Sequence, residues 1–149
     1  LSEAFAYHRQ KLIATPEMFG EMVRARFRMG GLIGGGDYVQ AQRVRNVLKR
    51  EFADALQRVD VIASPTMSNP ATRFDETGTW TTTIHRIRSF TGPYNLTGMP
   101  AISVPCGFTS AGLPVGLQIA GKPFDEPTVF RTAYTYQQQA KFYETRPAV

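Results

Sequence analysis

Two apolar runs near the carboxyl end of the chain have the length and composition of paired strands. They extend from Ala101 to Phe108 and from Pro114 to Gly121, and the turn-rich segment from Thr109 to Leu113 joins them. Asp125, which an acidic residue and a proline follow, begins a helix by the usual capping pattern. The pattern therefore predicts a strand pair followed by a helix. The residues expected on the buried side of this helix are Val129, Phe130, Ala133, Tyr134 and Ala140.

Two helices are predicted in the amino-terminal part of the chain. The first begins at Thr15, where a hydroxyl cap, a proline and an acidic residue suit a helix start, and Gly30 ends its apolar spacing. The second begins at Asp37 and has an apolar stripe, while its charged opposite face is interpreted as solvated surface. The stripe consists of Ala41, Val44, Leu48, Phe52, Ala55 and Val59.

A short strand is predicted directly after the second helix. It extends from Asp60 to Ser64, and Pro65 ends it. Further along, the segment from Trp80 to Thr91 has the spacing of an apolar helix face, and Pro93 to Gly98 has the pattern of a helical turn or loop. A helix that leads into a buried strand is typical of a layered sheet. The predicted fold class is α/β or α+β, with about four helices and three strands.

The charge of the chain changes this picture little. The formal net charge is +5, from 17 basic and 12 acidic residues, so an anionic partner is an option. The basic residues are interleaved with acidic ones along the predicted helices, and no run of five or more like charges occurs. This interleaving argues against a nucleic-acid groove, so nucleic acid is not the partner that the sequence favours.

The residues that usually bind metals or form disulfides are sparse. The single cysteine, Cys106, lies in an apolar strand, where we interpret it as a small buried residue, and it has no metal-ligand spacing around it. The sequence thus predicts no metal site and a reducing cytoplasm. No apolar stretch has the roughly 18 residues of a membrane span, and no signal-peptide pattern opens the sequence. We expect a soluble protein without a membrane partner.

Several segments have distinctive amino-acid sequences. The longest reads N-L-T-G-M-P-A-I-S-V-P-C-G-F and then G-L-P-V-G-L-Q-I-A-G-K-P-F-D-E, between Asn95 and Glu126. Shorter ones are P-E-M-F-G-E-M-V-R-A-R-F-R-M-G, D-Y-V-Q-A-Q-R-V-R and D-V-I-A-S-P-T, which begin at Pro16, Asp37 and Asp60. In this order and spacing they resemble the C-terminal region of the amidase signature family. The resemblance implies an α/β/α sandwich with a mixed sheet, and hydrolysis of carboxamides through a serine acyl-enzyme without a cofactor.

The nucleophile region of that family is missing from this sequence. The resemblance implies a triad of serine, cis-serine and lysine in a Gly/Ser-rich segment, and none of the six serines lies in a Gly-Ser-Ser run. These serines are Ser2, Ser64, Ser68, Ser89, Ser103 and Ser110. We therefore expect residues 1–149 to be the C-terminal segment of a larger amidase domain, with the N-terminal catalytic region absent and no catalytic residue here. The start at Leu1, within helical sequence, fits a truncated or cleaved polypeptide.

Two arginines are candidates for substrate binding through the resemblance. In relatives that use glutamine, the resemblance implies that an arginine a few residues before the helix-ending glycine holds the substrate carboxylate, and Arg26 has this position before Gly30. The planar guanidinium suits this task. The alternative is an exposed helix residue. Those relatives read D-I-F-T where this sequence has Arg88-Ser-Phe-Thr, or where Arg86 stands in a shifted register. A cation there repels an α-ammonium, which favours a general amidase with a neutral or anionic substrate.

Ser64 and Thr66 are candidates because of their position. They flank Pro65 at the carboxyl end of a predicted strand, where ligands tend to bind in open α/β sheets. The alternative is ordinary turn chemistry beside a proline.

Three functions remain open at this point. The first is an amidase, the second is the glutaminase subunit of a tRNA-dependent amidotransferase, and the third is a non-enzymatic basic interaction module. The expected partners are a small-molecule amide substrate and the N-terminal part of the same enzyme. Because the segment alone is expected to expose an apolar sheet edge and helix face, a homo-oligomer is a further option.

Overall fold

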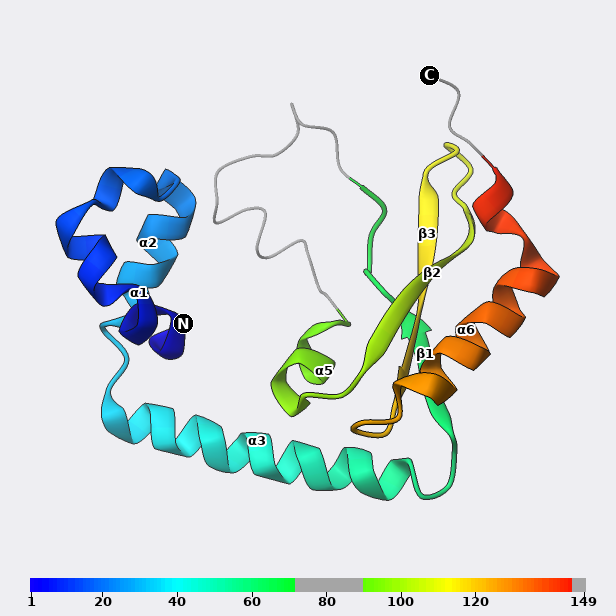
Figure 1. The fold of residues 1–149 in the computed structure, drawn as a ribbon, viewed down its shortest axis with the longest axis horizontal. Coiled ribbons are helices and arrows are strands. Elements are labelled where there is room, and N and C mark those ends of the chain that lie inside the picture. Colours follow the sequence, from blue (N-terminus) through cyan, green and yellow to red (C-terminus); the bar gives the residue numbers. More distant parts are fainter. Residues whose placement is uncertain (72–89, 146–149) are drawn as a thin grey trace. The chain divides into compact units, whose positions relative to one another are not determined.

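The computed structural model describes residues 1–71 and 90–145, which form five α-helices and one three-stranded sheet (Figure 1). The helices are α1 (Ser2–Ala14), α2 (Glu21–Gly30), α3 (Gly35–Ala55), α5 (Gly92–Thr97) and α6 (Glu126–Ala140), and the strands are β1 (Val61–Pro65), β2 (Ala101–Phe108) and β3 (Pro114–Gly121). Two short 3-10 helices, Pro16–Met18 and Phe142–Glu144, accompany them. The chain divides into two compact units, residues 1–45 and residues 46–149.

Aromatic rings hold the first unit together. The ring of His8 on α1 stacks on Phe27 of α2, with 5.0 Å between centroids and 7° between planes, and Phe19 meets Phe27 edge-on at 6.0 Å. Near the start of α3, Tyr38 Oη donates a 2.9 Å hydrogen bond to Glu3 Oε1. This bond to a carboxylate favours the protonated phenol and raises the pKa of Tyr38. The stacking of His8 on Phe27 makes His8 part of the packing between α1 and α2.

The helix predicted to begin at Thr15 is divided in the structure. A 3-10 turn covers Pro16–Met18, and α2 begins only at Glu21, after the extended Gly20. The hydroxyl of Thr15 donates to the Lys11 carbonyl at 3.3 Å, so it serves the end of α1 rather than the start of α2. The capping signal does mark a helix boundary, but the prediction assigned it to the wrong helix.

The sheet lies in the second unit and has the strand order β1-β3-β2, with both pairs antiparallel. Ser64 pairs with Gln118, and Gln118 pairs with Ser103, so these three side chains share one face of the sheet. Pro65 belongs to β1 rather than ending it, which an edge strand tolerates. The other edge strand, β2, has a register irregularity beside Pro105.

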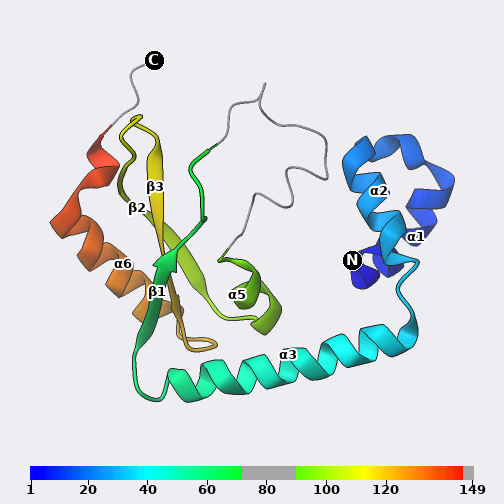
Figure 2. The same ribbon diagram turned by 180° about the vertical axis from the view of Figure 1, so that it is seen from behind.

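One face of the sheet packs against α6. Val104, Ile119 and Ala133 are buried there, and the residues packed around them are Val61, Ile102, Leu117 and Tyr136. Gly121 permits the close approach of α6, because a methyl group at this position would lie 2.6 Å from Val129 Cγ2. Figures 1 and 2 show α6 along one side of the sheet and α5 on the other.

The opposite face is divided into an apolar part and a polar part. The apolar part is a cluster of Leu56, Tyr94, Met99 and Ala120, with Phe52 and Ile62 packed against it. The polar part lies one step further along β3, around Gln118, where Ser64 and Ser103 are its partners in register. This second part is where the sheet is left open.

The predicted strands Ala101–Phe108 and Pro114–Gly121, and the helix after Asp125, are confirmed. The inward assignment of two residues of α6 was wrong: Phe130 and Tyr134 are 62% and 65% exposed, because Val129 and Ala133 hold the side toward the sheet. The apolar stripe of α3 is covered only in part: Phe52 packs against the core cluster and Leu48 and Ala55 are half-buried, whereas Val44 is exposed. The helix predicted over Trp80 to Thr91 lies almost wholly outside the described residues.

The uncovered apolar side chains predict self-association of the isolated chain. Phe130 and Tyr134 on α6, and Val44 and Val47 on α3, are exposed to water in the described part of the structure. Light scattering coupled to size-exclusion chromatography of the purified 149-residue chain should reveal oligomers or aggregates. A monodisperse monomer that melts cooperatively would contradict this expectation.

Candidate functional site

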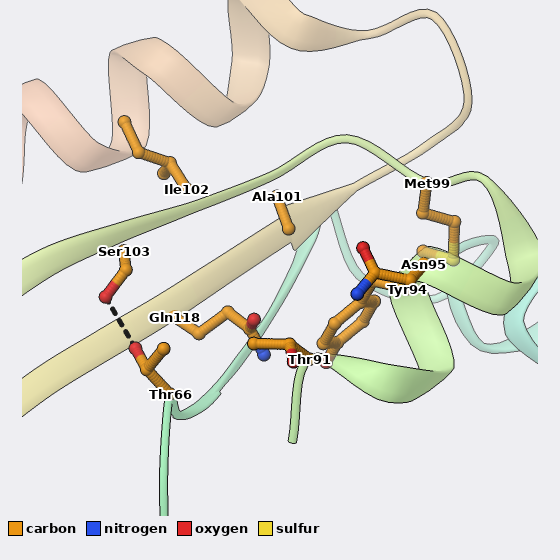
Figure 3. A pocket seen from close by; sticks show the side chains of 9 residues that line it. All are labelled: Thr66, Thr91, Tyr94, Asn95, Met99, Ala101, Ile102, Ser103 and Gln118. Carbon is orange, nitrogen blue, oxygen red and sulfur yellow. Dashed lines mark hydrogen bonds between the residues drawn. The ribbon is translucent and has the colours of Figure 1, made fainter. Parts of the chain in front are cut away.

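A cavity of about 380 Å³ opens on the polar part of the sheet face. Its wall is built by the end of β1, the middle of β3, the start of β2 and the helix α5 (Figure 3). The residues that line it are Thr66, Thr91, Tyr94, Asn95, Met99, Ala101, Ile102, Ser103 and Gln118. All of them belong to the second unit, and none carries a charged side chain. The cavity therefore offers hydroxyl, amide and apolar groups to a ligand.

Gln118 is the most buried polar residue of this wall. Only 3% of it is exposed, although it stands in the central strand between apolar neighbours. Its Nε2 donates to the Ser64 Oγ at 3.3 Å and to the Phe90 carbonyl at 3.2 Å. These two bonds join β3 to β1 and to the segment that precedes α5. They compensate part of the cost of burying a carboxamide in the sheet.

Two hydroxyl groups meet next to Gln118. Thr66 Oγ1 and Ser103 Oγ are 2.6 Å apart and share one hydrogen bond, in which either oxygen can be the donor (Figure 3). The Thr66 backbone N–H donates to the Gly116 carbonyl at 2.9 Å, which holds the hydroxyl at the end of β1. Gly116 lies beneath the pair: a methyl group there would be 2.7 Å from Ser103 Oγ and 2.8 Å from Thr66 Oγ1. Only glycine leaves room for this arrangement.

The helix α5 supplies the wall opposite the strands. Thr97 is buried and donates from its hydroxyl to the Pro93 carbonyl at 2.8 Å, while Gly98 ends the helix with a positive φ of 75°. This turn places Tyr94 and Asn95 toward the cavity (Figure 3). Tyr94 also packs on Phe52 at 5.6 Å between ring centroids, so the cavity wall continues into the core.

The four residues proposed from the sequence have different positions. Thr66 lines the cavity, and Ser64 stands one layer behind it as a hydrogen-bond acceptor of Gln118. Arg26 is an exposed residue of α2, in the first unit, and Arg88 lies outside the described residues. The prediction of Ser64 and Thr66 relied on the carboxyl end of a strand in an open α/β sheet, whereas the described strands form an antiparallel sheet. Ser64 and Thr66 instead lie near the cavity because they belong to or adjoin the row of polar residues that crosses the sheet, formed by Ser64, Gln118 and Ser103.

Gln118 and Ser103 were not among the site residues predicted from the sequence, because the two strands that contain them look uniformly apolar. Their alternation contains the signal: on β3, Leu117 and Ile119 are large and apolar, while Gly116, Gln118 and Ala120 are small or polar. A period of two with a glutamine on the second face marks a face that is not simple core. Among the residues that the structure describes, no cluster of three His, Cys, Asp or Glu is arranged for a metal ion, and no helix is long and apolar enough to span a membrane.

The family model described as Amidase matches residues 9–130 of the chain. The chain belongs to the amidase signature family. The A subunit of glutamyl-tRNA(Gln) amidotransferase from Methanosarcina barkeri is 46% identical over 136 residues, which cover 88% of this chain and 28% of that protein. An amidase of Pseudomonas putida is 37% identical over 153 aligned residues, covering 99% of this chain and 33% of that protein.

Solved structures give the same family. The crystal structure of the A subunit of glutamyl-tRNA(Gln) amidotransferase from Thermotoga maritima matches with a TM-score of 0.69 and 34% identity, over 83% of this chain and 28% of that one. This amidase-family chain therefore spans about a third or less of the length of the relatives it matches. The expected fold class, a portion of the amidase-signature α/β fold, is confirmed.

The contact between Gly116 and the hydroxyl pair predicts an energetic coupling in this amidase-family chain. Gly116→Ala should lower the free energy of unfolding by about 1–3 kcal/mol, because the added methyl group overlaps both hydroxyl groups. In a Ser103→Ala background the same change should cost at least about 0.5 kcal/mol less, since one of the two contacts is gone. Urea denaturation of the four proteins of this cycle measures the coupling. Costs that simply add would show that the methyl group does not meet Ser103.

Proposed function

We propose that this chain is the substrate-binding C-terminal portion of an amidase that hydrolyses carboxamides to a carboxylate and ammonia or an amine. Family membership supports the reaction class, and the cavity on the polar part of the sheet supports a binding role for this portion. The observation that carries the proposal is the composition of the cavity: it has hydroxyl and carboxamide groups, and none of the nine described residues that line it is charged. Such a wall suits a neutral amide group.

The proposed nucleophile lies outside this chain. The cavity contains the hydroxyl groups of Thr66 and Ser103, and the described residues that line it include no histidine, lysine or carboxylate to accept a proton from them. An unassisted hydroxyl is a poor nucleophile, so these groups bind rather than attack. The family resemblance implies a serine, cis-serine and lysine triad upstream of residue 1, within the same larger amidase domain.

A second candidate is the glutaminase subunit of a tRNA-dependent amidotransferase. It is favoured by the 46% identity to a protein named as one subunit of glutamyl-tRNA(Gln) amidotransferase, compared with 37% to a protein named as an amidase. This function would add partner subunits. Against it stand the basic residue, Arg88 or Arg86 in a shifted register, at the place where the resemblance implies an acidic residue in glutamine-using relatives, and the absence of a carboxylate among the described residues that line the cavity. Glutamine carries an α-ammonium that requires such a partner.

The remaining substrate assignments belong to the same proposal. Thr66, with Ser64 behind it, is assigned to the neutral part of a substrate, and the assignment of Arg26 and Arg88 to an anionic part rests on the family resemblance alone. The third function, a basic interaction module, has no specific observation in its favour. The small number of cysteines agrees with a reducing compartment such as the cytoplasm.

Restoring the upstream sequence tests the reaction class. The complete enzyme should release ammonia from one or more members of a panel of primary amides, and the 149-residue chain alone should release none. Glutamine as the preferred substrate, together with co-purifying subunits, would select the amidotransferase instead. An intact upstream triad with no turnover of any amide would contradict both functions.

The role of Arg26 is tested by substrates that differ only in a carboxylate. If its guanidinium holds that group, Arg26→Ala in the complete enzyme should raise KM about 10-fold or more for the anionic amide, which corresponds to losing one charge-assisted hydrogen bond. KM for the uncharged amide should stay unchanged. Arg28→Ala, on the same exposed helix, is the matched control and should affect neither substrate. Equal effects of the two variants would remove Arg26 from the binding site.

A further inference from the structure

We infer that the side-chain oxygen of Gln118 accepts a hydrogen bond from the N–H of the substrate's carboxamide, and that Gln118 thereby selects amides over esters and carboxylate products. The inference rests on the proposed function, because it names the group of the substrate that this cavity reads. The role inferred for Gln118 is binding, not catalysis. Gln118 touches the substrate but takes no part in bond making.

The orientation of the Gln118 carboxamide is fixed by one of its partners. The Phe90 carbonyl can only accept a hydrogen bond, so the atom that lies 3.2 Å from it must be the nitrogen. The same nitrogen donates to Ser64 Oγ at 3.3 Å. Both donors of Gln118 are therefore used for holding the side chain in place. The oxygen is directed away from these two partners.

The oxygen of Gln118 is left as an acceptor for a ligand. Neither of the two hydrogen bonds that Gln118 makes within the described residues uses Oε1. Within the same part of the chain, no fully enclosed side-chain nitrogen or oxygen lacks a partner. Oε1 is therefore not fully enclosed, and Gln118 is one of the residues that line the cavity. Since only 3% of the residue is exposed to water, a ligand donor that reaches this oxygen replaces a poorly hydrated contact.

The neighbouring hydroxyl pair completes the match to an amide. Thr66 and Ser103 have two hydroxyl protons and use one of them between themselves, so the other remains to donate. Ser103 is the direct cross-strand neighbour of Gln118, which places this donor beside the Gln118 acceptor. A carboxamide presents a carbonyl acceptor and an N–H donor side by side. The cavity wall offers the complementary donor and acceptor.

This arrangement separates substrates from compounds that lack an N–H. An ester has no donor for Gln118 Oε1, and a carboxylate product places an anionic oxygen against it. A site built to pair a hydrogen-bonding group discriminates strongly against analogues without that group, because its own polar atom is left unpaired. The prediction is a preference for amides that depends on residue 118.

The test compares a primary amide and the methyl ester of the same acid in the complete enzyme. Gln118→Met keeps the shape and removes the acceptor, and it should lower the ratio of kcat/KM for amide to that for ester by about 10-fold or more. Ser64→Ala removes one of the two hydrogen bonds that hold the side chain but keeps Oε1, so it should lower the ratio less than Gln118→Met does.

The outcomes separate the role of Gln118 from the proposed function. If the wild-type enzyme hydrolyses neither compound, the proposed function fails. If it hydrolyses both and Gln118→Met lowers them equally, only the role of Gln118 is overturned. A measurement on the wild-type enzyme covers the case in which the variants do not fold: a primary carboxamide inhibitor should bind about 10-fold or more tightly than its N,N-dimethyl form. Equal binding of the two inhibitors would equally overturn the inference.

Discussion

The central strand β3 faces two different environments at once. Leu117 and Ile119 point to the face that α6 covers, where the packing is apolar, while Gly116 and Gln118 point to the other face. Because β3 is bonded to strands on both sides, its register decides which residues of β1 and β2 join each face. A slip by one residue would bring Gln118 under α6 and Ile119 into the cavity. The fold of the second unit and the site on it therefore depend on the same register.

The polar row that results from this register connects structure with recognition. Ser64 and the Phe90 carbonyl hold the nitrogen of Gln118, and the Thr66–Ser103 pair fits only above a glycine. A buried carboxamide in a central strand costs stability unless it is paired. Here the pairing is complete on the nitrogen side and leaves the oxygen to the cavity. The structure thus retains a polar group where an apolar one would pack more simply, which is expected of a binding site.

Local pattern in the sequence predicted the strand pair and the helix after Asp125, because alternation, turn residues and caps are short-range signals, while the family was indicated by the resemblance of several segments. The side of α6 that faces the sheet could not be predicted in this way. Phe130 and Tyr134 are apolar, and only the position of the sheet beside Val129 and Ala133 decides that they face outward. Gln118 was not predicted as a site residue for a related reason. A single glutamine in an apolar run indicates a polar site only when its cross-strand neighbours Ser64 and Ser103 are known.

The central claim is that the polar part of this sheet face is the wall that holds the amide of the substrate. A crystal structure of the complete enzyme with a bound, unreactive primary carboxamide tests it most directly. We expect the amide nitrogen within hydrogen-bond distance of Gln118 Oε1 and the amide oxygen next to the Thr66–Ser103 pair. A carboxamide bound elsewhere in the enzyme, with no contact to these three residues, would contradict the claim.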